Sequence, residues 1–125
     1  MNTVHIVALL AVVQFILFGI LVGRARGKYG IKAPATSGHE MFDRAYRVHA
    51  NTLELLVCFL PALLIASAYW PNHIIAGIGA VYLVGRFIYW RAYMTNPASR
   101  AIGFALSMIP VLALVIFALV GAVIR

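Results

Sequence analysis

Residues 44–70, RAYRVHANTLELLVCFLPALLIASAYW, are the stretch that decides the fold. A polar segment with helical periodicity leads into a run, from Leu55 to Trp70, that contains no charged residue. Glu54, at the junction, and Arg86, farther along, are the only two charged side chains set well inside apolar segments of membrane length. A charge at that depth costs roughly 3 kcal/mol on insertion scales unless it meets a partner or water. Both residues are therefore candidates for a functional site.

The composition of the whole chain is that of a membrane protein. Its 125 residues are 64% hydrophobic and 10% charged, which is too apolar for a soluble domain of this size and sufficient for about four membrane spans. We therefore predict a single all-α domain over residues 1–125, an integral membrane bundle of four transmembrane helices. The spans are expected at about residues 2–23, 48–70, 73–93 and 101–124, with Pro71-Asn72 in a tight turn.

The distribution of positive charge predicts the orientation of this bundle. Most Lys and Arg residues lie in or beside the connection between the first two spans, and Arg91 and Arg100 flank the connection between the last two. By the positive-inside bias, both connections are cytoplasmic and both termini lie on the opposite side. The charges follow the first apolar run instead of preceding it, so we expect this run to remain as an anchor and not to be removed as a signal peptide.

The formal net charge of +7 requires no nucleic-acid partner. Topology and attraction to anionic lipids are a sufficient explanation, and this explanation stays open beside a functional one for Arg24, Lys28 and Lys32. The connection that holds them, from Gly23 to about Asp43, is rich in Gly, Pro, Ser and Thr, so an ordered loop or a short interfacial segment is expected. A GxxxG pair at residues 19 and 23 is typical of close helix packing in membranes.

Two polar stripes run along the second and third spans. At about 100° per residue, the first stripe falls within an arc of about 80° and the second within about 60°. The first stripe comprises Arg44, Arg47, Asn51, Glu54 and Cys58, and the second comprises Tyr82, Arg86, Tyr89 and Tyr93. Polar faces this narrow within apolar helices must be buried against something polar, either each other or a ligand.

One interpretation of the stripes is purely structural, namely a salt bridge from Glu54 to Arg86 or Arg47 that joins two helices. Such a pair leaves a surplus of hydrogen-bond donors, because the stripes also hold further arginines, an amide and several phenols. The surplus favours a site for an anionic guest with many hydrogen-bonding groups. This site would open toward the cytoplasmic end, where Tyr93 and Arg100 lie.

The same residues resemble a known family. The segments RAYRVHANTLE (44–54), FLP (59–61) and GRFIYWRAY (85–93), followed by Arg100, are similar to MAPEG, the membrane-associated proteins of eicosanoid and glutathione metabolism. The resemblance covers nearly the whole chain and includes the four-span plan. Its combined spacing, R-x-x-x-N-x-x-E and then G-R-x-x-Y-x-x-x-Y, is specific.

The resemblance implies an assembly and a set of roles. The assembly is a homotrimer of four-helix subunits, with glutathione sites between neighbouring subunits that open to the cytosol. Arg47, Asn51 and Glu54 would hold the carboxylate, amide and amino groups of glutathione. Tyr89 and Tyr93 would complete the pocket.

Four further arginines and one histidine belong to the predicted site. Arg100 would lie beside the sulfur as the catalytic residue, whereas Arg44 and Arg86 would add positive charge to the binding site. Arg26 occupies roughly the place of a loop arginine in the transferases. His49 stands where some relatives carry glutamine, and the stretch 90–92 replaces a more common glycine-containing one.

The chemistry of glutathione fits this charge balance independently of the resemblance. Glutathione has two carboxylates, one ammonium group and a thiol, so its site needs several cations and one anion. The free thiol has a pKa of about 8.5, and the thiolate is the nucleophile. A guanidinium about 4 Å from the sulfur, at an effective dielectric constant near 20, contributes ~4 kcal/mol before desolvation. If half of this survives, the pKa of the bound thiol falls below 7.

We therefore predict a membrane-bound glutathione transferase of detoxification, with glutathione as co-substrate and no metal. Its other partners would be lipids and lipophilic electrophiles from the bilayer, and lipid hydroperoxides are candidate substrates for a peroxidase activity. Two alternatives stay open: a non-catalytic glutathione- or lipid-binding protein of the same family, and a small multidrug exporter. The exporter should carry its carboxylate in the first span, where this chain has only Gln14.

Overall fold

The computed structural model describes all 125 residues, which form four long α-helices and one short 3-10 helix, with no strand. The elements are α1 (Thr3–Tyr29), α2 (Glu40–Ser67), α3 (Asn72–Thr95), η1 (Pro97–Ser99) and α4 (Ala101–Ile124). Each of the four long helices has the length and the apolar composition needed to cross a membrane. The predicted all-α fold with four membrane-length helices is thus confirmed.

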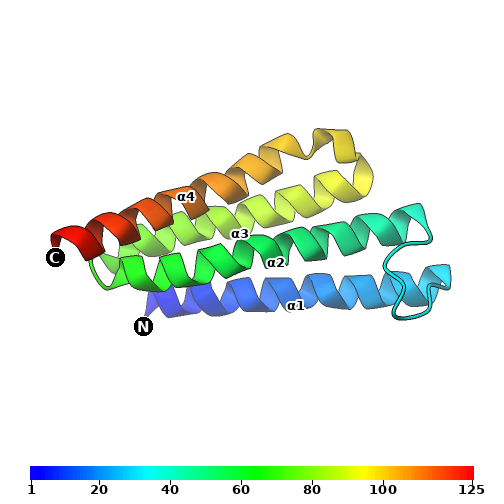
Figure 1. Cartoon of the computed structure of the whole chain (residues 1–125), viewed down its shortest axis with the longest axis horizontal. Helices are drawn as coiled ribbons and strands as arrows, with labels where there is room; N and C mark the ends of the chain where they lie inside the picture. The colour runs from blue at the N-terminus through cyan, green and yellow to red at the C-terminus, as the bar shows by residue number, and fades with distance from the viewer.

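The four helices lie side by side and alternate in direction (Figure 1). Both termini and the α2–α3 turn lie at one end of the bundle, and the α1–α2 connection and η1 lie at the other. The two basic connections therefore share one end, which we call the basic end. That arrangement is the one expected from the charge pattern.

The connection between α1 and α2 is shorter than expected. α1 continues through Arg26 and Lys28 and ends where Gly30 takes a left-handed conformation, with φ of 68°. Basic residues in the last turn of a helix interact favourably with its dipole, which lets α1 continue past its apolar stretch. α2 begins at Glu40 and is capped by His39, whose ring nitrogen Nδ1 accepts a hydrogen bond from the backbone N–H of Met41. The prediction of a loop from residue 23 to 43 was therefore wrong at both ends.

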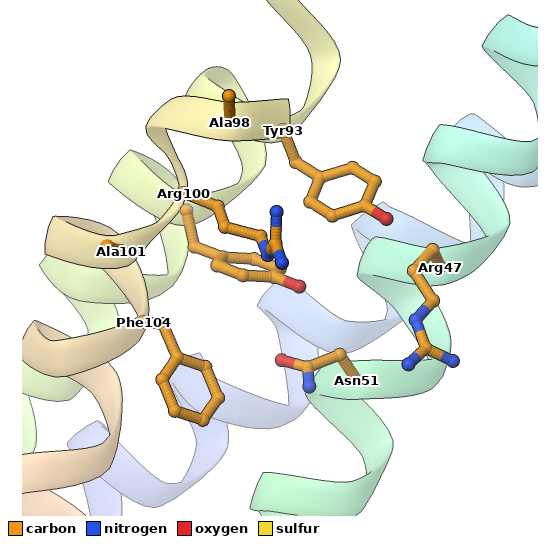
Figure 2. A pocket seen from close by; sticks show the side chains of 8 residues that line it. Arg47, Asn51, Tyr93, Ala98, Arg100, Ala101 and Phe104 are labelled. Carbon is orange, nitrogen blue, oxygen red and sulfur yellow. The ribbon is translucent and has the colours of Figure 1, made fainter. Parts of the chain in front are cut away.

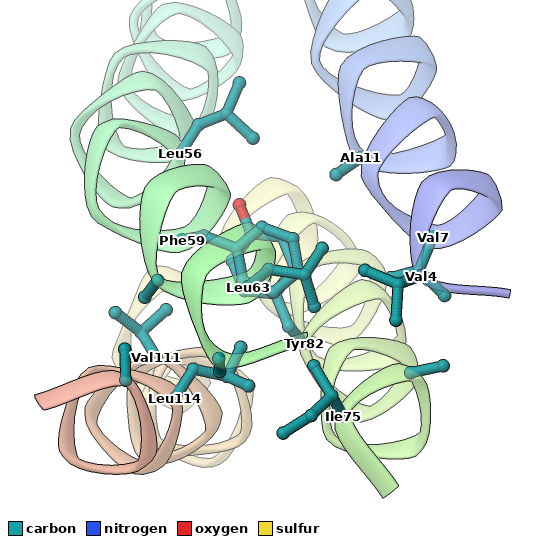
Figure 3. Close-up of a cluster of buried hydrophobic side chains, with 14 of the residues drawn as sticks. Val4, Val7, Ala11, Leu56, Phe59, Leu63, Ile75, Tyr82, Val111 and Leu114 are labelled. Carbon is teal, nitrogen blue, oxygen red and sulfur yellow. The ribbon is translucent and has the colours of Figure 1, made fainter. Parts of the chain in front are cut away.

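Apolar side chains from all four helices meet in the half of the bundle nearer the termini (Figure 3). Tyr82 is fully buried there and stacks on Phe59, with ring centroids 3.9 Å apart. Tyr82 therefore belongs to the core, although the sequence pattern groups it with the polar stripe of α3. The largest apolar cluster occupies this half of the bundle, whereas Arg47, Asn51, Tyr89 and Tyr93 lie in the other half beside two smaller apolar clusters.

α3 and α4 approach each other most closely at two glycines near the basic end. A Cβ atom on Gly85 would lie 2.6 Å from the carbonyl carbon of Leu106, and one on Gly103 would lie 2.4 Å from the backbone nitrogen of Tyr89. Both distances are shorter than any real contact of a Cβ atom. These glycines allow α4 to lie directly against the part of α3 that carries Tyr89.

The predicted GxxxG pair has no such role within the chain. A Cβ atom on Gly23 would meet nothing within 4 Å, and one on Gly19 would lie nearest the His49 ring, 3.1 Å from its Nε2 atom, and not against the backbone of another helix. Other glycines therefore allow the close packing within this subunit, including Gly79 of α3, where an added Cβ would lie 2.6 Å from the Val7 side chain of α1.

Replacing Gly103 by Ala should destabilise the bundle, because the added methyl group would collide with the α3 backbone. Overpacking of this kind costs about 1–3 kcal/mol, so the midpoint of thermal unfolding in detergent should fall. Gly77→Ala is the matched control, since a Cβ atom there meets nothing and Ala is the better helix former. Equal midpoints for the two variants would contradict the close approach of α3 and α4.

Candidate functional site

A pocket with a volume of about 580 Å³ opens between α2, α3 and α4 near the basic end (Figure 2). This volume lies within the range of about 300–1,000 Å³ that is usual for small-molecule sites. The pocket is lined by Arg47, Asn51, Tyr89, Tyr93, Ala98, Arg100, Ala101 and Phe104. Five of the predicted site residues therefore line one cavity, although they come from α2, α3 and the junction of η1 with α4.

Helical spacing aligns the polar side chains of the pocket. Arg47 and Asn51 are one turn apart on α2, and Tyr89 and Tyr93 are one turn apart on α3, with ring centroids separated by 5.6 Å. Residues four apart lie on the same face of a helix. Each pair therefore turns toward the cavity as a unit.

Arg100 reaches the pocket from the junction of η1 and α4. Its Nη1 atom donates a hydrogen bond to the carbonyl oxygen of Pro97 over 2.9 Å, which leaves most of the guanidinium free. Figure 2 shows Arg100, Tyr93 and Asn51 extending into the space between the helices, with Arg47 lying along α2 at its edge. No Asp or Glu lines the cavity, and neither arginine forms an ion pair in the chain. The pocket therefore favours an anionic guest.

Arg86 supports the pocket from inside the bundle. Its side chain is fully buried, its Nη2 atom donates to Oδ1 of Asn51 over 2.9 Å, and its guanidinium lies 4.4 Å from the ring centroid of Tyr89. Because Arg86 occupies the oxygen of this amide, the Nδ2 group of Asn51 remains to donate to a guest. Arg86 thus fixes which end of the Asn51 side chain the pocket presents.

The alternative of a salt bridge from Glu54 to Arg86 or Arg47 was wrong for this chain. Its only ion pair joins Glu40 and Arg44, one turn apart at the start of α2. Glu54 is exposed near the middle of α2. It lies about 60° around the helix from Asn51, and this rotation carries its carboxylate away from α3 and out of the bundle.

Arg44 lies beside the pocket and not in it. It donates to the carbonyl oxygen of Met94 over 3.0 Å and pairs with Glu40. It lines a neighbouring, more open cavity of about 660 Å³ that also touches Arg47 and Tyr93. Glu40 and Asp43 also line this second cavity and offset the charge of Arg44, so its role in binding stays a prediction.

Two predicted ligands lie on other sides of the bundle. His49 stacks on Phe15 of α1, with ring centroids 4.4 Å apart. Arg26 donates to the carbonyl oxygen of Ala35 over 2.8 Å and lies 4.9 Å over the Phe42 ring. A single copy of the chain does not bring either of them to the pocket. Their assignment as ligands stays a prediction that requires a neighbouring copy, as does that of Glu54.

The apolar wall of the pocket was not predicted from the sequence. Phe104 lies one turn after Arg100 on α4, and its ring centroid is 6.3 Å from that of Tyr89. The spacing of four from Arg100 was the only signal that could have indicated it. This wall places apolar surface beside the cations, so the pocket can hold an apolar group next to an anion.

Comparison with known proteins is decisive for the family. The model of the MAPEG family matches residues 4–120, which is nearly the whole chain. The chain is a member of the MAPEG family. With its four apolar helices, this MAPEG protein is a multi-pass integral membrane protein. The match favours the predicted family over the small multidrug exporter.

Several MAPEG relatives are similar over most of the chain. An uncharacterized protein from Synechocystis sp. is 43% identical over 93% of this chain and 85% of its own length. Human microsomal glutathione S-transferase 2 is 34% identical over 82% of this chain and 69% of its own length. Leukotriene C4 synthase from Cavia porcellus is 34% identical over 75% of this chain and 63% of its own length. At the level of the family, these relatives indicate a glutathione-related membrane enzyme.

Replacing Asn51 by Leu should destabilise this MAPEG protein, because the buried Arg86 would lose its only side-chain hydrogen bond. A hydrogen bond to a charged group contributes about 1.5–3 kcal/mol, so thermal unfolding in detergent should occur at a lower temperature. Asn51→Asp is the matched control, since its carboxylate still accepts from Arg86 and should preserve stability. If both variants unfolded at the same temperature as the parent, the Arg86–Asn51 hydrogen bond would not contribute to the stability of the fold.

Proposed function

We propose that this protein is a membrane-bound glutathione transferase that activates the thiolate of glutathione for attack on lipophilic electrophiles. The observation that carries the proposal is the pocket itself. It presents two arginines without acidic partners, an amide donor and two phenols beside an apolar wall. A membrane protein with such a pocket, and with a microsomal glutathione S-transferase among its relatives, is suited to an anionic thiol peptide.

The proposed binding mode assigns each polar group of the pocket to one part of glutathione. Arg47 would pair with a carboxylate, and the free Nδ2 group of Asn51 would donate to a carboxylate or an amide oxygen. The hydroxyl groups of Tyr89 and Tyr93 can donate to the remaining acceptors. The ammonium group needs an anion, and Glu54 is the predicted partner.

Arg100 is the proposed catalytic residue. A guanidinium stays protonated at any physiological pH and therefore supplies charge without titrating. Placed about 4 Å from the sulfur, it would stabilise the thiolate by ~4 kcal/mol before desolvation. The thiolate would then be the main form of bound glutathione at neutral pH.

The transfer reaction balances without a metal or a redox partner. The thiol proton passes to water, and the thiolate sulfur forms a bond to the electrophilic carbon. In an aryl chloride, the carbon–chlorine bond then breaks and chloride leaves with the electron pair. With a lipid hydroperoxide, two glutathione molecules would instead be oxidised to the disulfide, and the hydroperoxide would be reduced to an alcohol and water.

An apolar groove supports the proposed entry of electrophiles from the bilayer. It lies between α2 and α4 in the half of the bundle nearer the termini, has a volume of about 380 Å³ and shares no lining residue with the pocket at the basic end. Its lining includes Val57, Pro61, Ile65 and Leu119 and has no charged residue. A membrane-dissolved molecule could contact the protein there without leaving an apolar environment.

The proposed active form is a homotrimer with glutathione between neighbouring subunits and the sites on the cytoplasmic side. Glu54 supports an assembly, because it is exposed in the middle of a membrane-length helix. Such a charge facing lipid would cost roughly 3 kcal/mol on insertion scales. A neighbouring copy that covered Glu54 would remove this cost and could bring Arg26 and His49 of one subunit to the pocket of the next.

Arg100→Ala should reduce turnover far more than glutathione affinity, because the proposed partner of Arg100 is the sulfur. The pKa of the bound thiol would rise toward its free value of about 8.5, so conjugation of a chloronitrobenzene should fall at neutral pH and partly recover at high pH. Arg47→Ala is the contrasting variant. It should weaken glutathione binding about ten- to a hundredfold in calorimetry and keep the parent pH profile.

Either of two results would overturn these assignments. An Arg100→Ala protein with the parent pH profile of conjugation would remove Arg100 from the chemistry. A folded Arg47→Ala protein with unchanged affinity would mean that glutathione binds elsewhere. Bound glutathione whose thiol is not ionised in the parent would instead favour a non-catalytic binding protein.

Native mass spectrometry of the detergent-solubilised protein should give the mass of three chains. The number three comes from the resemblance to the family, and the exposed carboxylate of Glu54 supports only that the chain assembles. A stable dimer or monomer that still binds glutathione would contradict a site between three neighbouring subunits.

A further inference from the structure

A second cavity at the basic end lies on another side of the bundle from the proposed glutathione site. It has a volume of about 420 Å³ and is formed by α1 and α3, with part of α2. The two cavities share no lining residue. Neighbouring residues of α3 face different cavities: Tyr89 and Tyr93 line the first, whereas Trp90 and Met94 line the second. Consecutive residues of a helix point about 100° apart, which separates the two sites.

The lining of the second cavity combines apolar side chains with two cations. Leu21, Met41 and Trp90 contribute apolar surface. Arg24 and Lys28, one turn apart on α1, are exposed and also line it. No acidic residue lines the cavity, and neither cation takes part in the only ion pair of the chain. The positive charge of this cavity is therefore available to a bound anion.

The cavity lies where the uncharged stretch of α1 gives way to basic residues. The uncharged stretch of α1 ends at Gly23, and the first cation of the cavity follows immediately. The cavity thus spans the boundary between an apolar membrane segment and the basic connection. Tyr29 and Trp90 also line it, and such amphipathic rings are enriched where a membrane meets water.

We propose that this cavity binds an anionic phospholipid, with its phosphate on Arg24 and Lys28 and an acyl chain against Trp90. The two cations match a phosphate, and the apolar lining matches a hydrocarbon chain, which inorganic phosphate lacks. A choline headgroup would bring its own cation toward the arginine and is therefore disfavoured. The bound lipid would fill the gap between α1 and α3.

The structure separates cations that the sequence treats alike. Arg24 and Lys28 line the cavity, whereas Lys32 is exposed in the connection and does not. A surface potential alone would make all three equivalent, because each carries one charge at the same end of the bundle. Lys32 is consequently the matched control for a defined site.

Quenching of Trp90 fluorescence by brominated lipids tests the proposal. The Trp70→Phe variant, in which Trp90 is the only tryptophan, serves as the parent. It is reconstituted in phosphatidylcholine vesicles that contain an increasing fraction of a lipid with brominated acyl chains, either phosphatidylglycerol or phosphatidylcholine. The parent should be quenched at a lower content of brominated phosphatidylglycerol than of brominated phosphatidylcholine. The Arg24→Gln/Lys28→Gln variant should need about tenfold more phosphatidylglycerol.

Two controls make the result specific. Lys32→Gln should quench like the parent, and the charge-preserving exchange Arg24→Lys/Lys28→Arg should retain the preference even if the neutral variant folds poorly. Equal quenching by the two lipids in the parent would overturn the proposal. So would an equal loss in Lys32→Gln, which indicates a general surface potential, or complete displacement of the lipid by millimolar inorganic phosphate.

Discussion

The burial of one guanidinium without a carboxylate partner is the constraint on which the polar half of this molecule depends. Arg86 is fully buried; its Nη2 atom donates to the amide oxygen of Asn51 and its guanidinium lies over the ring of Tyr89, whereas its Nε and Nη1 atoms have no partner within the chain. An unpartnered charge in such surroundings would be strongly destabilising. α2 and α3 are therefore held in the register that brings these groups together. Both partners of Arg86 also line the proposed glutathione site.

The contact between Arg86 and Asn51 contributes to the packing of α2 on α3 and also determines which groups face the pocket. Arg86 donates to the oxygen of the Asn51 amide, so Asn51 presents its Nδ2 donor to the pocket. The guanidinium of Arg86 also lies against the ring of Tyr89 and adds positive charge beneath the pocket. The close approach of α4, which Gly103 permits, then brings Phe104 beside Tyr89 and Arg100 to the rim. A cationic pocket with an apolar wall results from helix packing that the core already requires. The far half of the bundle stays apolar, which suits a membrane.

The sequence was sufficient to predict the four-helix architecture and to group Arg47, Asn51, Tyr89, Tyr93 and Arg100, which line one pocket. Composition is sufficient for four membrane-length helices, because a segment of this apolarity has few other stable forms. The spacing of four residues predicted that Arg47 lies on the same helix face as Asn51, and Tyr89 on the same face as Tyr93, because helical geometry is nearly fixed. Periodicity gives the angular width of a polar face on a helix, but it does not show which residues of that face point into the bundle and which point out of it. The pattern therefore grouped Glu54 with Asn51, although they diverge in the fold.

Other features could not be predicted because they depend on contacts between distant segments. His49 lies against Phe15, and nothing in the local pattern around either residue indicates that pairing. The end of α1 was placed too early, because apolarity marks the membrane boundary and not the end of a helix. The division of the basic cluster into Arg24 and Lys28 beside a cavity and Lys32 outside it likewise depends on how α1 packs on α3.

The central claim, that the pocket binds glutathione as its thiolate, is tested most directly by ultraviolet difference spectroscopy. Glutathione is titrated into the detergent-solubilised protein at neutral pH, and the thiolate absorbance is recorded. The account predicts a saturable rise in thiolate absorbance, accompanied by proton release. S-methylglutathione, which has no ionisable thiol, should produce no such rise while competing for the site. Saturable binding of glutathione without thiolate absorbance would contradict the account.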